Sequence, residues 1–270
     1  MASDDMPESA EFPDLDQKMP VLFIGHGTPM NAIEDNAFSR AWAELGRQFP
    51  RPKAIVCISA HWETGGTRVT VAERPHTIHD FYGFPEPLKK MQYPAPGSPA
   101  LAKFINKLVT KVRVAPDVDW GLDHGAWSVL YRMYPDADVP VIQLSLDCTK
   151  GAPFHYELGK ALRPLRRKGV LVVGSGNIVH NLSTVVLEDT AFDWAVAFDR
   201  FVKEAIVAGK HSDVVYYQQL GETAAKAVPT NEHYLPLLYV LALREKHDEV
   251  EFFTEQVTLG SISMRSLRLG

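Results

Sequence analysis

Short apolar runs recur along the chain, and each is bounded by glycine, proline or polar residues. The runs are Val21–Ile24, Ala54–Ser59, Val69–Val71, Val139–Leu144 and Val170–Val173. Runs of this length without strict polar alternation predict strands that are buried on both faces. The C-terminal stretch Val257–Leu269 is also typical of β structure, with a turn at Gly260.

Amphipathic segments lie between these runs and predict helices. In the first such segment, apolar residues are spaced three to four apart from Phe38 to Phe49. The other predicted helices cover residues 99–112, a segment that starts near Ala126, Phe154–Lys168, Trp194–Val207 and Glu232–Leu243. Buried strands that alternate with helices indicate an α/β fold, with one domain and a parallel or mixed central sheet flanked by helices. Ligands of such sheets bind at the carboxyl ends of the strands.

Two segments depart from this alternation. Residues 1–18 carry six acidic residues and one lysine, which predicts a disordered acidic tail before a single domain over 19–270. Residues 72–97 are rich in proline, glycine and aromatic residues, which predicts a long irregular segment, and such loops are often functional. Within it, His79–Phe84 is expected to form either a lid over a site or a structural loop fixed by its own aromatic side chains.

Composition narrows the class of protein. Of the 270 residues, 46% are hydrophobic and 23% are charged, which is typical of a globular protein. The longest apolar runs fall short of the roughly 18 residues that span a bilayer. The formal net charge of −5 offers no surplus of cations for a nucleic acid backbone. Two cysteines, Cys57 and Cys148, cannot form a disulfide scaffold, and together with the lack of a signal-peptide pattern they favour a cytoplasmic protein. We therefore expect neither nucleic acid nor a membrane as partner.

Histidines follow three of the predicted strands. His26 lies two residues beyond Ile24, His61 two beyond Ser59, and His180 seven beyond Val173. Because the carboxyl ends of parallel strands meet at one edge of a sheet, these histidines should lie close together. Neutral imidazole is the commonest biological ligand for divalent transition metals. Two histidines with a third ligand on one face leave open positions for substrate and oxygen, as in non-haem Fe(II) oxygenases.

The third ligand could come from the sequence Asn231-Glu232-His233. Adjacent residues on a helix point about 100° apart, so Glu232 and His233 are not expected to serve one metal together. His124, in Asp123-His124-Gly125, and His180 are acid/base candidates or further ligands.

Seven short motifs occur in order along the chain. They are Gly25–Met30, Ser59–Trp62, Thr77–Pro85, Tyr93–Gly97, Asp123–Gly125, Gly176–Leu182 and Glu232–Leu238. Together they resemble the 4,5-DOPA extradiol dioxygenases. This branch belongs to the class III ring-cleaving dioxygenases and is related to the catalytic chain of protocatechuate 4,5-dioxygenase. The resemblance runs from about residue 20 to the C-terminus.

The resemblance implies a single α/β domain with a divalent metal, Fe(II) in the active enzyme, although such proteins often carry zinc. By motif position, His26 and His61 match metal-binding histidines, and His233 falls where this branch supplies a further ligand. The wider class uses a glutamate in that region, so Glu232 stays an alternative. His180 matches the acid/base histidine, which is also counted among the metal-binding residues, and the resemblance makes His124 a second catalytic histidine of the active site.

The resemblance also implies a reaction. A catechol such as L-DOPA would be cleaved by O2 at the 4,5 position to a seco-DOPA semialdehyde, in a monomer or a homo-oligomer. Two other functions remain open at this point. Zinc has no redox chemistry, so a histidine-bound zinc would activate water and act as a hydrolase. Non-enzymatic relatives of this fold would use the histidine pocket as a binding module.

Overall fold

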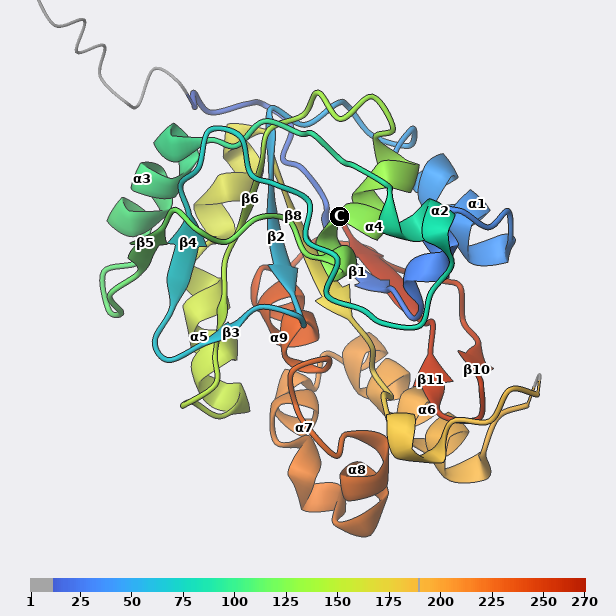
Figure 1. Ribbon diagram of the computed structural model, residues 1–270. Coiled ribbons are helices and arrows are strands. Elements are labelled where there is room, and N and C mark those ends of the chain that lie inside the picture. Colours follow the sequence, from blue (N-terminus) through green and yellow to red (C-terminus); the bar gives the residue numbers. More distant parts are fainter. Residues whose placement is uncertain (1–11, 189) are drawn as a thin grey trace, which may run out of the picture.

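A six-stranded sheet forms the centre of the computed structural model, which describes residues 12–188 and 190–270 (Figure 1). The spatial order of its strands is β6-β2-β8-β1-β12-β9. Their bounds are β1 Val21–Gly25, β2 Ala54–Ser59, β6 Val141–Gln143, β8 Val170–Gly176, β9 Val250–Phe253 and β12 Ser266–Leu269. The strands β6, β2, β8 and β1 are parallel, whereas β12 and β9 join antiparallel at the β1 edge. The mixed sheet expected from the sequence is therefore confirmed.

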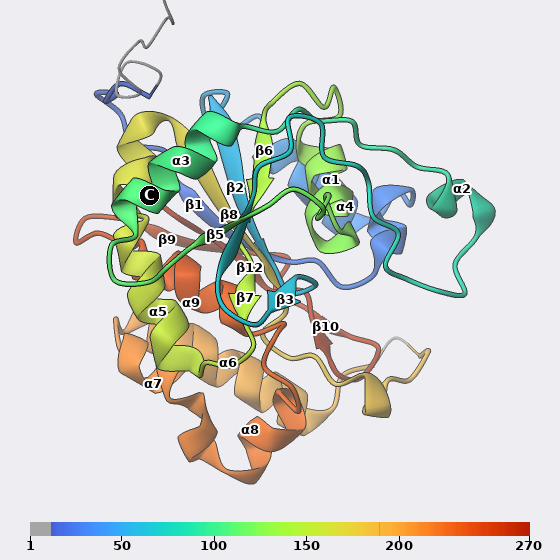
Figure 2. The same cartoon turned by 60° about the vertical axis from the view of Figure 1, so that its left-hand side comes forward.

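Helices cover both faces of the sheet (Figure 2). Along β1, Val21 and Phe23 belong to one apolar core and Leu22 and Ile24 to the other, because successive side chains of a strand point to opposite faces. The first core includes side chains of α3 (Pro99–Leu108), α5 (Ala152–Ala161), α6 (Asp193–Val207) and α9 (Leu235–Ala242). The second includes side chains of α1 (Ala37–Leu45) and α4 (His124–Met133). Two-sided burial explains why the strands are continuous apolar runs.

Shorter elements complete the chain. The short strands are β3 Glu63–Thr64, β4 Arg68–Thr70, β5 Ala115–Asp117, β7 Leu146–Asp147, β10 Val257–Thr258 and β11 Ile262–Ser263. The short α-helices are α2 Glu86–Lys89, α7 His211–Val215 and α8 Glu222–Ala227. The 3-10 helices of the described residues are η2 Pro29–Ala32, η3 Arg163–Lys168, η4 Leu182–Thr184 and η5 Tyr217–Leu220. Among the described residues, no helix combines the length and the apolar character that a membrane crossing requires.

Several predicted helices have different bounds in the structure: the helix expected over 99–112 ends at Leu108, and the pattern from Phe38 to Phe49 becomes a helix that ends at Leu45. The helix expected over Phe154–Lys168 ends at Ala161 and continues as the 3-10 helix η3, because Pro164 cannot donate the helical hydrogen bond and crowds the preceding turn. The helix expected over Glu232–Leu243 begins only at Leu235, with a proline in its first turn, where a missing N–H costs nothing. Glu232 and His233 therefore lie in a turn rather than on a helix.

The prediction of a disordered tail over residues 1–18 is wrong for residues 12–18, and residues 1–11 lie outside the described part of the chain. Phe12 is buried and its ring stacks on Phe104. Leu15 donates its backbone N–H to the carbonyl of Arg167, and Lys18 pairs with the buried carboxylate of Asp248 at 2.6 Å. A buried aromatic side chain and the ion pairs of Lys18 and Asp14 thus anchor a segment whose overall composition is acidic and polar.

Candidate metal centre

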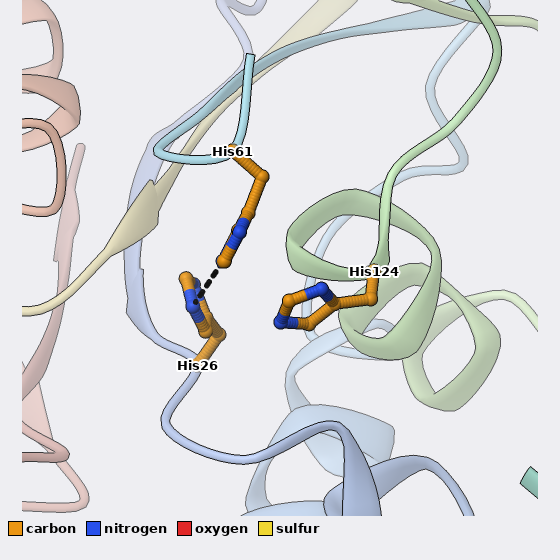
Figure 3. Close-up of side chains that lie close together, drawn as sticks. All are labelled: His26, His61 and His124. Carbon is orange, nitrogen blue, oxygen red and sulfur yellow. Dashed lines mark hydrogen bonds between the residues drawn. The ribbon is translucent and has the colours of Figure 1, made fainter. Parts of the chain in front are cut away.

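A cavity of about 590 Å³ lies beyond the carboxyl ends of β1 and β2. Its walls include every histidine that the sequence singled out as a ligand or catalytic residue, namely His26, His61, His124, His180 and His233. Their positions span most of the chain, so the fold itself brings them together. His26, His61 and His124 point toward one another in Figure 3.

The Gly-His-Gly sequence allows the chain to turn closely around Met264. A Cβ on Gly25 would lie 2.7 Å from the backbone carbonyl of Met264, and Gly27 has a φ of +59°, which favours glycine. Between these glycines, His26 is buried, and its backbone N–H donates to the carbonyl of Gly176 at the end of β8. This packing fixes where the first histidine leaves the sheet.

Buried polar groups beneath the cavity position the second histidine. Ser59, the last residue of β2, donates its hydroxyl to Oδ1 of Asp123 at 2.6 Å and accepts the backbone N–H of His61 at 3.2 Å. Gln143 donates to the other oxygen of Asp123 at 2.7 Å. Burial raises the pKa of the Asp123 carboxyl, as does the charge of Asp80, while the hydrogen bonds from Ser59 and Gln143 oppose this.

Asp80 connects two histidines and was not predicted as a site residue. Its Oδ2 lies 3.3 Å from Nδ1 of His61, and its Oδ1 lies 3.0 Å from Nδ1 of His124. Oδ1 also accepts the backbone N–H of His124, the first residue of α4. Burial raises the pKa of Asp80, but the contacts with His124 outweigh it and hold the pKa below its usual value. Asp80 comes from the irregular segment, where no periodicity marks it, although it lies within the quoted motif Thr77–Pro85.

His233 and His180 form the opposite wall. The carbonyl of His233 accepts the backbone N–H of Asn177 at 2.8 Å and packs on Gly176, where any Cβ would clash with it. The His180 ring stacks on the His233 ring with centroids 3.5 Å apart and an interplanar angle of 8°.

The helix expected to carry Glu232 and His233 begins only after them, and both lie in a turn. Nδ1 of His233 contacts Oε1 of Glu232 at 3.0 Å. Glu232 itself lines a neighbouring cavity with Glu63, whereas His233 lines the histidine cavity.

The hydrogen bonds determine which nitrogen of each ring is free. Ser175 donates its hydroxyl to the carbonyl of Gly125 at 2.6 Å, so it accepts from Nδ1 of His26 at 3.0 Å. The carboxylate of Glu232 likewise accepts from Nδ1 of His233, and Oδ2 of Asp80 lies 3.3 Å from Nδ1 of His61. The Nε2 atoms of His26 and His61 face each other at 3.1 Å.

Burial lowers the pKa of His26 and His233 well below the usual value. Burial and the nearby His124 lower the pKa of His61 to about 3. The imidazoles are therefore neutral at neutral pH, which is the form that binds metals. This donor set, with each Nδ1 held by an acceptor, fits a divalent transition metal.

Comparisons with known proteins agree with this geometry. Residues 20–269 match the sequence model of a family described as the catalytic LigB subunit of aromatic ring-opening dioxygenase. The chain is 47% identical over 260 residues to a protein of Escherichia coli K12 named 4,5-DOPA dioxygenase extradiol. The aligned residues cover 94% of this chain and 95% of that protein. The chain is 39% identical over 254 residues to a protein of the same name from Beta vulgaris, covering 92% and 95%. A crystal structure of an uncharacterized Escherichia coli K12 protein superposes with a TM-score of 0.83, at 44% identity, over 94% of this chain and 100% of that one.

Proposed function

Because the chain belongs to the LigB family of aromatic ring-opening dioxygenases, we propose that it cleaves a catechol such as L-DOPA at the 4,5 position, beside one of the two hydroxyl groups. Both atoms of O2 enter the product, a seco-DOPA semialdehyde. The observation that carries this proposal is the pair of neutral imidazoles of His26 and His61, whose Nε2 atoms face each other at 3.1 Å in the cavity.

The proposed metal ligands are His26, His61 and His233. Their ring centroids form a nearly equilateral triangle with sides of 5.1, 5.3 and 5.1 Å. The ligand atoms of His26 and His61 group with those of His124 within 4.8 Å, and the ligand atoms of His233 group with those of His180 and Glu232. The His124 ring lies only 3.9 Å from the His61 ring, and His180 lies against His233. Those two rings thus flank the triangle. Fe(II) held by these residues would supply the redox chemistry toward O2 that zinc lacks.

His180 is the proposed general base and acid. Burial lowers its pKa to about 4, against the opposing charge of Glu232, so its ring is neutral at neutral pH and can accept the proton of a catechol hydroxyl. No hydrogen bond holds the ring among the described residues, whereas the proposed ligands are each held at Nδ1. The ring can therefore receive a proton and later return it to the reacting oxygen.

His124 and the apolar wall are proposed to orient the substrate. Asp80 fixes the ring of His124 beside that of His61, where it can hydrogen-bond the reacting oxygens. Phe81 and Phe84 of the irregular segment line the same cavity and pack edge-to-face against each other. Aromatic side chains at this position exclude water and stack against a flat ring.

Oxygen consumption tests the proposal. The protein is loaded with Fe(II) under anaerobic conditions and offered L-DOPA, protocatechuate and catechol, while absorbance follows a yellow product. We expect uptake of O2 that requires Fe(II) and is lost in His61→Ala. The matched control is His247→Ala, which removes an exposed imidazole outside the cavity and should leave uptake unchanged. Absence of uptake with all three catechols, from protein shown to hold iron, would refute ring cleavage of these substrates.

A further inference from the structure

The histidine cavity carries an unusual balance of charge. Among the described residues that line it, none is a lysine or an arginine, whereas two are carboxylates, Glu34 and Asp80. Asp80 is engaged by the rings of His61 and His124. A carboxylate on a bound molecule would therefore leave water without finding a cationic partner in the cavity wall, which is unfavourable.

Glu34 is exposed and its carboxylate is available. Its nearest polar contact in the described chain is the amide of Asn36, at 3.5 Å from Oε2, and no ion pair involves it there. The backbone around it is fixed, because Arg132 donates from Nη2 to the carbonyl of Glu34 at 2.7 Å and from Nε to the carbonyl of Asn31 at 2.9 Å. The turn after η2 thus presents an anionic group on a well-anchored backbone.

We propose that the cavity selects catechols whose side chain ends in an amine over those whose side chain ends in a carboxylate, and that Glu34 receives the ammonium group. This inference rests on the proposed function, because it takes the histidine cavity to be the catechol site. Thr28, Asn31 and Glu34 line the same cavity of about 590 Å³ as the histidines, so a catechol with its oxygens at the histidines can extend its side chain toward Glu34. In L-DOPA, which carries both groups, the amine is the end that is recognised.

Three catechols with similar chains and different charges test the selectivity: dopamine, 4-ethylcatechol and 3-(3,4-dihydroxyphenyl)propionate. We expect kcat/KM to fall in that order, with about a tenfold difference between the amine and the acid, which corresponds to about 1.4 kcal/mol. Dissociation constants for the zinc-loaded protein, measured by calorimetry, should follow the same order without turnover. An acid that binds or reacts as well as the amine would overturn the proposal.

The variant Glu34→Gln tests the role of that residue. Because an exposed charge pair contributes modestly, we expect kcat/KM for dopamine to fall about two- to fivefold, with 4-ethylcatechol unchanged. The control is Asp35→Asn, since Asp35 pairs with Arg40 at 3.0 Å and does not line the cavity. An equal effect of Glu34→Gln on the amine and on the neutral catechol would exclude Glu34 as the ammonium acceptor.

The experiments distinguish failure of the proposed selectivity from failure of the proposed ring cleavage. Turnover that favours the acid would refute the selectivity and leave the ring-cleavage proposal standing. Selective binding without O2 uptake would refute ring cleavage and leave the selectivity standing. If none of the three catechols binds, both are wrong.

Discussion

Replacing Gly125 with alanine should reduce activity far more than stability. Gly125 lies in the first turn of α4, directly after His124, and the space beside its Cα is already filled. A Cβ there would lie 2.5 Å from Oγ of Ser59 and 2.8 Å from Cδ2 of His61. The Ser59 hydroxyl cannot yield easily, because it is hydrogen-bonded to the buried Asp123.

The magnitude follows from these distances. Ordinary contact of a Cβ begins near 3.4 Å, so the His61 ring must move by about 0.6 Å, the difference between 3.4 and 2.8. A misplacement approaching 1 Å in an active site costs up to about a hundredfold in rate, and we expect a ten- to hundredfold loss of kcat/KM. Alanine gains up to about 1 kcal/mol in helix propensity over glycine, whereas overpacking costs about 1–3 kcal/mol. With the full gain in propensity, the net loss of unfolding free energy is about 0–2 kcal/mol, and without it the loss is at most about 3 kcal/mol.

Three measurements check this reasoning: oxygen uptake, iron affinity by competition with a chelator, and thermal unfolding. The control is Gly65→Ala, where a Cβ meets nothing within 4 Å. We expect the control to match the parent protein in all three. A Gly125→Ala protein with iron affinity and kcat/KM within twofold of the parent would show that this contact does not fix the position of His61.

Three further predictions concern single groups. In Ser175→Ala the Nδ1 of His26 loses its acceptor, so metal affinity measured by equilibrium dialysis should fall about ten- to hundredfold. His180→Ala should lower kcat by about 10²- to 10⁴-fold with iron content near that of the parent; loss of the iron would instead make His180 a ligand. Although burial raises the pKa of Asp248, hydrogen bonds from Arg166 outweigh it and lower the pKa to about 2. This folded-state pKa lies below the unfolded value, so Asp248 contributes about 2 kcal/mol to the free energy of unfolding above pH ~4. That contribution is lost as the pH falls toward 2. Urea unfolding of the parent between pH 2 and 6 should show this loss, and Asp248→Asn should not.

The central fold could be predicted because burial on both faces leaves a direct trace in the sequence. The runs around Val21 and Val170 are apolar throughout, and both become neighbouring parallel strands. The convergence of His26 and His61 followed from the same logic, since each lies just beyond a strand of one sheet. Phe12 escaped prediction because a single aromatic residue in an acidic segment has no periodicity.

The surroundings of the histidines were harder to predict, because they depend on contacts between segments far apart in the sequence. Asp80 lies in an irregular loop, and only the tertiary structure places it between two histidines. Local signals in the sequence could have given a better prediction of the structure around His233. Pro236 favours a helix start at the preceding residue, which places Glu232 and His233 in a turn.

The order of strands in the sheet determines when the proposed metal ligands can come together as the chain is synthesised and folds. The strand β1, which leads to His26, has β8 on one side and β12 on the other, and β12 lies at the opposite end of the sequence. His233, likewise, is held against β8 by Asn177. During synthesis on a ribosome, the segment that carries His26 is made long before its partners emerge, so the three proposed ligands meet only late in folding. The complete set of proposed ligands is then available to a metal only after β8 and β12 have joined β1.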